Sequence, residues 1–316
     1  MIEIDGLRAP EGVLVSEAVR CYYLEDQSKT EIAAAMGVSR FKVARLLETA
    51  RTSGMVRIEV LDPSGVDGEL SARIRTAFSL RRCIVVSCAD SSPAVRSLVG
   101  SAGAQVISDV VGADDVLGLP WARTVAAMLR SLTALPPVPV VQLSGSLVIP
   151  REDSPVDIVR TVAGLTGADA WVYYSPLVLD DAGSADAMRR QPAVRAAMAQ
   201  VPRVTVAVVS IGAWSSGQST IHDALPEEVR ADVARHGTVG EALGVFFDAD
   251  GAVVHPEVSD RMVTITAEQL YGIPEVVALA TGAVKARAVR GFLRGGYASS
   301  LVVDRSLALA LLSLHE

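Results

Sequence analysis

Two basic residues, Arg123 and Lys285, follow apolar segments that contain glycine. The stretch "VLGLPWARTV" places Arg123 beside Thr124, shortly after Gly118, and "VVALATGAVKARAV" places Lys285 three residues after Gly282. We expect each stretch to be the end of a strand, a short loop and the start of a helix. The free N–H groups at a helix start attract anions, and a nearby cation adds to that attraction. These stretches therefore predict a site for a phosphorylated or otherwise anionic small molecule.

Lys285 is one of three lysines among 29 basic residues, and the rest are arginine. An arginine-rich composition can leave a surface lysine by chance. Alternatively, its amine can form a Schiff base with an aldehyde, which a guanidinium does not do. A lysine at a helix start acts most simply as a compact charge, so contact with an anion is the interpretation we favour. For Arg123 the alternative is a solvated helix residue.

Two further junctions have the same character. The stretch "VVQLSGSL" ends an apolar segment with Gln142, Ser144 and Gly145, and "VVSIGAWSSGQS" opens into a loop rich in glycine and serine. Ligands of open α/β sheets bind at the carboxyl ends of strands, so these positions are candidates for contact with the same molecule. Glycine turns are also needed for the fold alone, which is the alternative at each junction.

A different chemistry is indicated near the N-terminus. In "SKTEIAAAMGVSRFKVARLLETART", Ser28 and Glu31 form a capping box, Gly37 suits a turn with positive φ, and Ser39 caps the next helix. This spacing is typical of a helix-turn-helix, whose second helix enters the major groove of double-stranded DNA. Residues 39–57 carry five basic groups and one acidic group. The alternative is a plain three-helix bundle with a solvated basic face. The outward positions, and hence the candidate DNA contacts, are Ser39, Arg40, Phe41, Lys42 and Arg45.

The elements that must position these groups form two domains and a linker. We expect three helices and a short strand in a DNA-binding domain over residues 1–60, then a Pro- and Gly-containing linker over 61–69. Residues 70–316 alternate helices with apolar strands, which predicts an α/β domain with a mainly parallel sheet for effector binding and oligomerisation. Helices are expected over 121–132, 155–166, 187–199 and 283–293. Strands are expected over 83–87, 115–119, 138–145, 170–176, 204–212, 244–248, 262–266, 276–281 and 298–304.

Composition excludes several classes of protein. A net charge of −7 argues against coating nucleic acid through bulk charge, although a local basic patch can still bind it. Three cysteines give neither a disulfide framework nor metal-ligand spacing, so we expect a reducing cytoplasm and no metal or cofactor. No uncharged apolar stretch reaches about 18 residues, which argues against a membrane span. The four histidines are scattered, with no carboxylate at ligand spacing, and no nucleophile elbow occurs.

Taken together, these stretches resemble the SorC/DeoR-type sugar-binding transcriptional regulators. The resemblance covers nearly the whole chain and includes "VGEALGVFFDADG" and "EQLYGIPEVVALATGAVKARAVRGFLRGGYASSLVVD". It implies a sugar-phosphate isomerase/CoA-transferase-like effector domain, a homo-oligomer (dimer or tetramer), and a sugar, polyol or sugar-phosphate effector. It also implies effector contact by Gly118, Trp121, Arg123, Thr124, Gln142, Gly145, Asp248, Gly282 and Lys285.

Some of these assignments have a structural alternative. Trp121 can equally serve packing, and Asp248 can equally cap the turn in "DADG". The sequence departs from the family's loop pattern at Pro120, Ala122, Ser146 and Thr281, so both phosphorylated and unphosphorylated effectors remain candidates.

The sequence thus predicts a regulator whose affinity for an operator is controlled by a small effector. The alternative from another class is a sugar-phosphate isomerase or aldolase-like enzyme with an appended DNA-binding module. Such an enzyme needs a positioned base with a tuned pKa, and no convincing carboxylate–histidine pair stands out.

Overall fold

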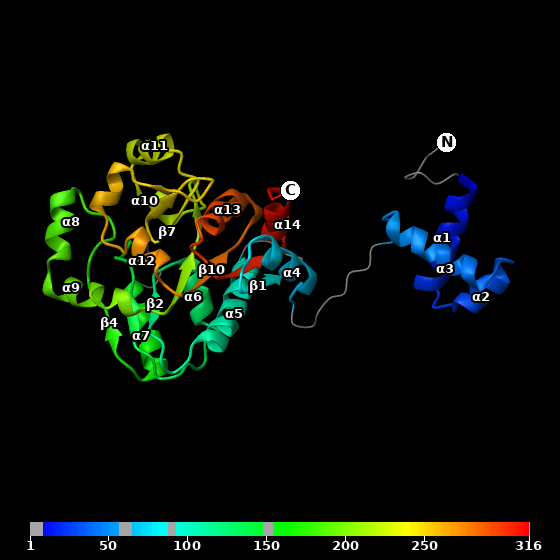
Figure 1. Ribbon diagram of the computed structural model, residues 1–316, viewed down its shortest axis with the longest axis horizontal. Coiled ribbons are helices and arrows are strands. Elements are labelled where there is room, and N and C mark those ends of the chain that lie inside the picture. The colour runs from blue at the N-terminus through cyan, green and yellow to red at the C-terminus, as the bar shows by residue number, and fades with distance from the viewer. Residues whose placement is uncertain (1–8, 57–64, 88–92, 148–153, 316) are drawn as a thin grey trace. The chain divides into compact units, whose positions relative to one another are not determined.

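The computed structural model describes residues 9–56, 65–87, 93–147 and 154–315 (Figure 1). The chain divides into two compact units, Met1–Leu61 and Asp62–Glu316. The strand expected near residue 56 falls largely outside the described residues, as does the first part of the expected linker. Gly68 and Glu69, also expected in the linker, are the first residues of a helix, α4, which is capped by Asp67.

The N-terminal unit is a helix-turn-helix preceded by one helix: α1 Ala9–Tyr23, α2 Lys29–Ala35 and α3 Arg40–Thr52. The Ser28–Glu31 capping box starts α2, and the Ser39 hydroxyl accepts a hydrogen bond from the Lys42 N–H at the start of α3. Gly37 has φ +63° in the turn between them. The predicted capping box of α2, the Ser39 cap of α3 and the positive φ of Gly37 are confirmed. Apolar residues from all three helices share one core: Val15, Ala18, Cys21, Ile32, Ala33, Val43, Leu46, Leu47 and Ala50.

The large unit is built on a seven-stranded parallel sheet with the order β1-β11-β10-β5-β2-β3-β4. The predicted mainly parallel α/β fold is therefore confirmed. Strand order reverses between β5 and β2: the chain moves from β2 outward to β4, and from β5 outward to β11. The strands are β1 Arg82–Val86, β2 Leu117–Leu119, β3 Val140–Gln142, β4 Ala170–Trp171, β5 Val206–Ser210, β10 Glu275–Ala280 and β11 Ser300–Asp304.

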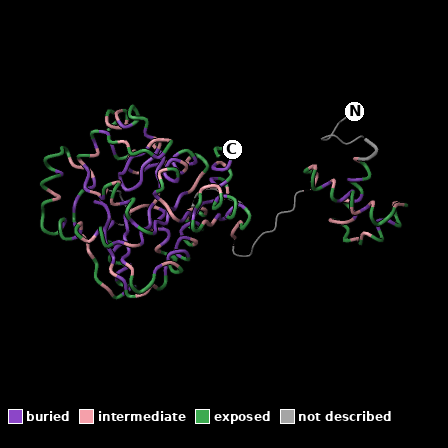
Figure 2. The backbone as a smooth tube through the Cα atoms, viewed as in Figure 1, coloured by how far each residue is buried: buried purple, intermediate pink, exposed green. Residues whose placement is uncertain are grey.

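Helices cover both faces of this sheet, which explains why its strands are apolar throughout. Alternate residues of β10 face opposite sides: Val277 and Leu279 join one core cluster, and Val276 and Ala278 join the other. In Figure 2 the buried backbone runs through the middle of the large unit and the exposed backbone lies mainly on its outer helices. The first cluster is covered by α5 Pro93–Val110, α6 Arg123–Leu129 and α7 Pro155–Thr166, and the second by α4 Gly68–Ala77, α13 Ala286–Arg294 and α14 Arg305–Ser313.

A smaller antiparallel sheet follows β5, in the order β6-β7-β8-β9. Its strands are Gly212–Ala213, Gly240–Ala242, Val245–Phe247 and Val253–Val254. The remaining elements are α8 Ala182–Arg189, α9 Pro192–Met198, α10 Thr220–Ala224, α11 Glu227–Arg235 and α12 Ala267–Tyr271, with 3-10 helices η1 Val201–Arg203, η2 Glu257–Arg261 and η3 Ala283–Lys285.

Three expectations about elements are wrong. Residues 262–266 make only isolated bridges, Met262 with Val178 and Thr264 with Ser144, so they form no strand. The helix expected over 187–199 is two helices, because Pro192 begins α9 and lacks the N–H that a continuing helix needs. The helix expected from 283 begins as the 3-10 turn η3, and α13 starts at Ala286.

Candidate functional site

A cavity of about 120 Å³ lies where the strand order of the parallel sheet reverses. A single water needs about 10–15 Å³ of such space, so the cavity can hold a small organic molecule. It is lined by residues that follow the carboxyl ends of four strands: Pro120 after β2, Ser144 after β3, Ile211 after β5 and Thr281 after β10. This is the position at which open α/β sheets bind ligands.

Lys285 lies in the cavity wall, and its ammonium donates a hydrogen bond of 2.9 Å to the Ile211 carbonyl oxygen. Burial lowers the pKa of Lys285 from its usual 10.5 to about 8 because the charged form loses water. The nearby guanidinium groups of Arg123 and Arg96 contribute to this lowering, and the Glu241 carboxylate opposes it. Lys285 is therefore a partly desolvated amine that is about half protonated near pH 8.

A buried carboxyl group, Glu241 on β7, faces the same cavity. Its Oε1 accepts a 2.8 Å hydrogen bond from the Ser219 hydroxyl, and its Oε2 accepts a 3.3 Å bond from the Gly244 N–H. Burial raises the pKa of Glu241, while these hydrogen bonds and Lys285 act in the opposite direction. Gly212 lies so close to Glu241 and Ser219 that a Cβ at this position would collide with both side chains. The small sheet thus places an oxygen acceptor beside the ammonium group.

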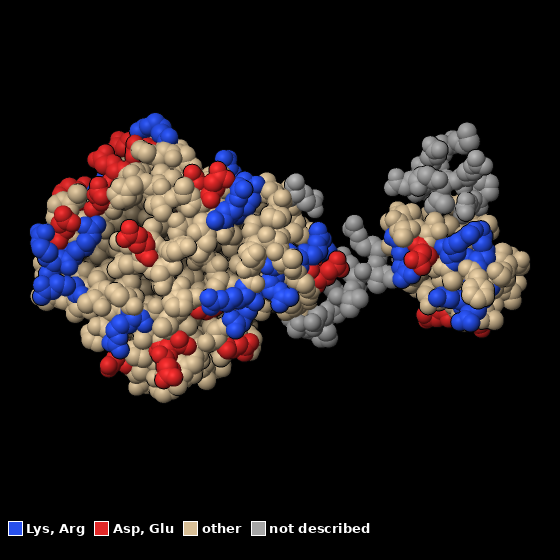
Figure 3. All heavy atoms as spheres, viewed as in Figure 1, with Lys and Arg blue, Asp and Glu red and all other residues tan. Residues whose placement is uncertain are grey.

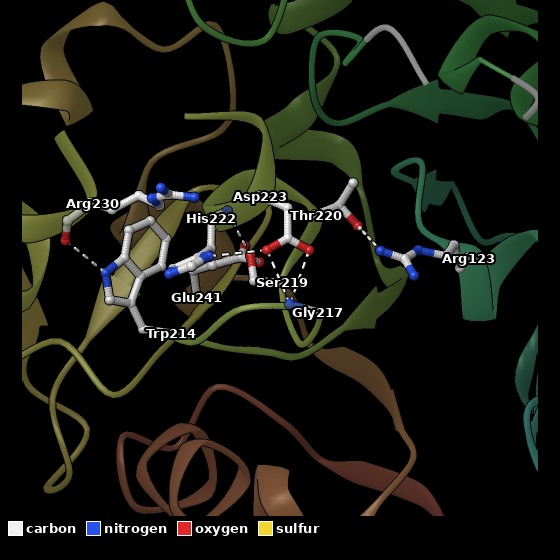
Figure 4. Close-up of polar contacts among 9 residues, drawn as sticks. All are labelled: Arg123, Trp214, Gly217, Ser219, Thr220, His222, Asp223, Arg230 and Glu241. Atoms are coloured by element: carbon white, nitrogen blue, oxygen red, sulfur yellow. Dashed lines mark hydrogen bonds and ion pairs between the residues drawn. The ribbon is translucent and has the colours of Figure 1, made fainter. Parts of the chain in front are cut away.

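Arg123 also lines the cavity. Figure 4 shows it reaching from α6 toward Thr220, whose hydroxyl accepts a long hydrogen bond of 3.4 Å from its Nη2. Behind Thr220, Asp223 accepts two bonds from the Gly217 N–H and contacts the His222 ring at 3.0 Å. The segment 214–223 is therefore held by its own hydrogen bonds, and its residues Ser219 and Thr220 line the cavity.

Six of the predicted effector residues line the cavity together: Trp121, Arg123, Thr124, Ser144, Gly145 and Lys285. Trp121 also packs against a core cluster, and its indole N–H has no hydrogen-bond partner among the described residues. Gly145 is also needed for packing, since a Cβ there would meet the backbone of Pro176.

The other four predicted effector residues have structural roles outside the cavity lining. Gly118 lets β2 pack against Val204, and the buried Gln142 amide bonds the Ser144 carbonyl and the Tyr173 N–H. Asp248 accepts bonds from two N–H groups of its own turn, which is the capping alternative. Gly282 has φ +94° and begins the 3-10 turn η3.

One backbone donor at the junction after β10 is not free for an anion, because a carboxylate of the chain binds it. The Gly282 N–H donates a 2.6 Å hydrogen bond to Oδ1 of Asp304. The other oxygen of Asp304 accepts bonds from the Ser306 and Leu307 N–H groups and so caps α14. An anion in the cavity therefore cannot use this N–H while Asp304 binds it, whereas the side chains of Arg123 and Lys285 line the cavity.

Residues missed by the sequence analysis complete the cavity. Arg96 comes from α5, and Ser219, Thr220 and Glu241 come from the small sheet and its loops. Part of the signal lies in the stretches "VVSIGAWSSGQS" and "VGEALG", but their local patterns assign none of their residues to the site. The sequence analysis also did not name two carboxylate–histidine contacts, His222 with Asp223 and His255 with Asp260.

The N-terminal unit carries a second candidate site on α3. Arg40, Phe41 and Arg45 are exposed, Lys42 is half-buried, and the Ser39 hydroxyl is engaged as the helix cap. Lys and Arg side chains gather on the face of this unit that Figure 3 shows. The predicted outward positions thus belong to the solvent-facing side of a helix whose other side is packed, as a recognition helix requires.

Metal and membrane sites are not indicated by the described residues. Within the described ranges, no cluster of three or more His, Cys, Asp or Glu side chains could hold a metal ion. No helix in those ranges is long and apolar enough to cross a membrane.

A helix-turn-helix joined to an α/β unit with a polar cavity at the strand ends defines a ligand-responsive DNA-binding protein. Comparisons with known proteins agree. Residues 64–313 match the family model described as "Putative sugar-binding domain". The chain is 31% identical to the transcriptional regulator YjhU of Escherichia coli over 95% of this chain and 94% of that protein. It is 29% identical to the transcriptional regulator LsrR of Klebsiella pneumoniae over 98% and 95%.

The fold is also that of a solved regulator. The full-length sorbitol operon regulator SorC from Klebsiella pneumoniae superposes with a TM-score of 0.73 at 22% identity, covering 96% of this chain and all of that one. The chain therefore belongs to the SorC-type family of sugar-binding transcriptional regulators. The predicted class of protein is confirmed, and the comparisons give no support to the enzyme alternative.

Proposed function

We propose that a small sugar-type effector binds in the cavity at the strand-order reversal and thereby changes the affinity of α3 for its operator. The observation that carries this proposal is the lining of that cavity. The cationic groups of Arg123 and Lys285 lie in the same small space as the Glu241 carboxyl and several hydroxyls. Cations favour an anionic substituent such as phosphate, and the remaining groups match sugar hydroxyls.

The mechanism is thermodynamic linkage. If the effector binds one arrangement of the DNA-binding units better than another, it shifts the population of the two, and operator affinity follows. Typical coupling energies of about 1–3 kcal/mol change affinity by about 5–150-fold.

Paired recognition helices bind two half-sites about 34–36 Å apart, so we also propose that the protein acts as a homo-oligomer, a dimer or tetramer. Light scattering of the purified protein tests that state. We also propose that the protein acts in the cytoplasm, where it would reach its operator.

A thermal-shift screen identifies the effector. The full chain is tested with sugars and polyols, and each is paired with its phosphate ester. A molecule present at 100 times its Kd should stabilise the large unit by about 2.7 kcal/mol. Stabilisation by the ester alone indicates that the cations bind phosphate, whereas equal stabilisation by both forms indicates a neutral effector. If no member of either series stabilises the protein, the proposed effector class is wrong.

A mobility-shift assay with DNA from upstream of the protein's own gene then tests the coupling. Lys285→Met should abolish the response to the effector and leave DNA binding intact. Arg287→Met is the matched control, because Arg287 lies only two residues further along the chain, in α13, but is exposed and outside the cavity lining. Equal responses from both variants would show that the cavity is not the effector site.

A further inference from the structure

We propose that Phe41 reads thymine in the operator, by packing its ring against the C5-methyl group of that base in the major groove. This proposal rests on the proposed role of α3 in DNA binding. It adds a specificity-determining contact of a different kind from the contacts that basic side chains make.

The geometry of α3 places Phe41 directly away from the protein core. The buried residues of this helix are Val43, Leu46, Leu47 and Ala50. At about 100° of rotation per residue, their mean direction is roughly opposite to that of Phe41. Arg45 lies one turn further along on the same outward side. Phe41 therefore occupies the middle of the face that a recognition helix turns toward DNA.

The fold itself makes no use of the Phe41 ring. It is 88% exposed, the highest value among the large apolar side chains of the described residues. It is absent from the core cluster of the N-terminal unit, and no ring or cation contact involves it within the described residues. Keeping an aromatic ring in water is unfavourable, so its burial is expected on binding a partner.

The surroundings of Phe41 indicate that this partner is DNA. Arg40 and Arg45 are exposed on either side, and Lys42 follows directly. Such cations are drawn to phosphates, which position a helix in the groove. Phe41 is the second residue of α3, and base contacts come from the N-terminal residues of a recognition helix.

The chemistry of a phenyl ring then selects the base. A phenyl ring neither donates nor accepts a conventional hydrogen bond, so it cannot distinguish the polar edges of guanine, adenine and cytosine. The thymine methyl group is the apolar feature that the major groove displays. A ring lying along phosphates would gain nothing from its apolar surface, which makes the methyl contact the favoured one.

The experiment removes thymine methyl groups one at a time. Full-length wild-type protein selects a duplex from a random library, and each thymine of that duplex is then replaced by deoxyuridine. Burial of one methyl-sized group is worth about 0.8 kcal/mol, so the critical replacement should weaken wild-type binding about four-fold. Phe41→Ala should bind the thymine duplex more weakly than wild type does, and replacing the critical thymine with deoxyuridine should not weaken its binding further. Phe41→Leu should still lose some affinity on that replacement, because leucine can also contact the methyl group.

Two controls separate this contact from other effects. Leu24→Ala removes another exposed apolar side chain of the same unit, 78% exposed, and should respond to deoxyuridine as wild type does. Phe41→Ala should leave the salt dependence of binding unchanged, while Arg45→Ala should reduce its slope by about one if Arg45 binds a phosphate. Circular dichroism should give the same melting temperature for Phe41→Ala and wild type.

The proposal is overturned if no deoxyuridine replacement weakens wild-type binding, or if Phe41→Ala loses the same factor as wild type at every position. A wild-type protein that selects no duplex at all would instead overturn the DNA-binding role of α3, and this proposal with it. Failure of the thymine contact leaves sequence-selective DNA binding intact, whereas failure of the DNA-binding role removes it, so the two failures are distinguishable.

Discussion

Lys285 should make the large unit more stable as the pH rises through about 8. Burial lowers its pKa from 10.5 to about 8 in the folded protein. One pKa unit corresponds to about 1.4 kcal/mol, so holding Lys285 charged in the folded state costs about 3 kcal/mol. A lysine at this position therefore reduces the stability of the effector-free protein, whereas an anion bound beside it would relieve that cost.

The sign of the pH dependence follows from proton binding. Below pH 8 the amine is protonated in both the folded and the unfolded chain, and the full cost is present. Between about pH 8 and 10.5 the unfolded chain binds more protons, so stability rises with pH. Above that range the amine is neutral in both states, and the cost has disappeared.

Urea unfolding at a series of pH values measures this effect. The three tryptophans, Trp121, Trp171 and Trp214, all lie in the large unit, so their fluorescence reports its unfolding alone. Lys285→Met lacks the titrating amine. Subtracting its profile from that of wild type removes the contribution of other groups. The difference should rise by about 3 kcal/mol between pH 8 and 10.5. A flat difference, or one that falls, would refute the desolvation of Lys285, and Arg287→Met should reproduce the wild-type profile.

Three further substitutions test other features of the structure. Glu241→Gln should keep the acceptor for Ser219 but remove a carboxylate that raises the pKa of Lys285. The pH-dependent rise in stability should then begin below pH 8 in the same unfolding assay. Gly251→Ala should destabilise the large unit by about 2–4 kcal/mol in urea, because φ is +86° and the added Cβ would strike the backbone of Gly295. A loss below about 1 kcal/mol would contradict this packing. Ser28→Ala removes the capping box of α2 and should cost the N-terminal unit about 0.5–2 kcal/mol, measured by thermal melting followed by circular dichroism. An unchanged melting temperature would show that the cap is not needed.

Local features of this protein could be predicted from the sequence because they depend on neighbours within a few residues. The Ser28–Glu31 capping box and the positive φ of Gly37 follow from side chains and backbone limits close in the chain. The apolar strands and the helical spacing of α3 likewise follow from periodicity. Even local patterns left some alternatives open, and Asp248 proved to cap its own turn.

The composition of the cavity was decided only by the tertiary structure. Ser219 and Glu241 are 22 positions apart, and Arg123 and Thr220 are 97 apart, yet each pair is hydrogen-bonded. Parallel strands bring the loops after β2, β3, β5 and β10 to one edge, whatever their distance in the chain. Whether the N–H of Gly282 is free for an anion depends on a carboxylate 22 residues away. Sequence alone indicated Arg123, Lys285 and the predicted recognition helix, since their types and spacing are local, but it did not indicate Arg96. The partners of those cations are set by which strands lie side by side, and that is a property of the fold.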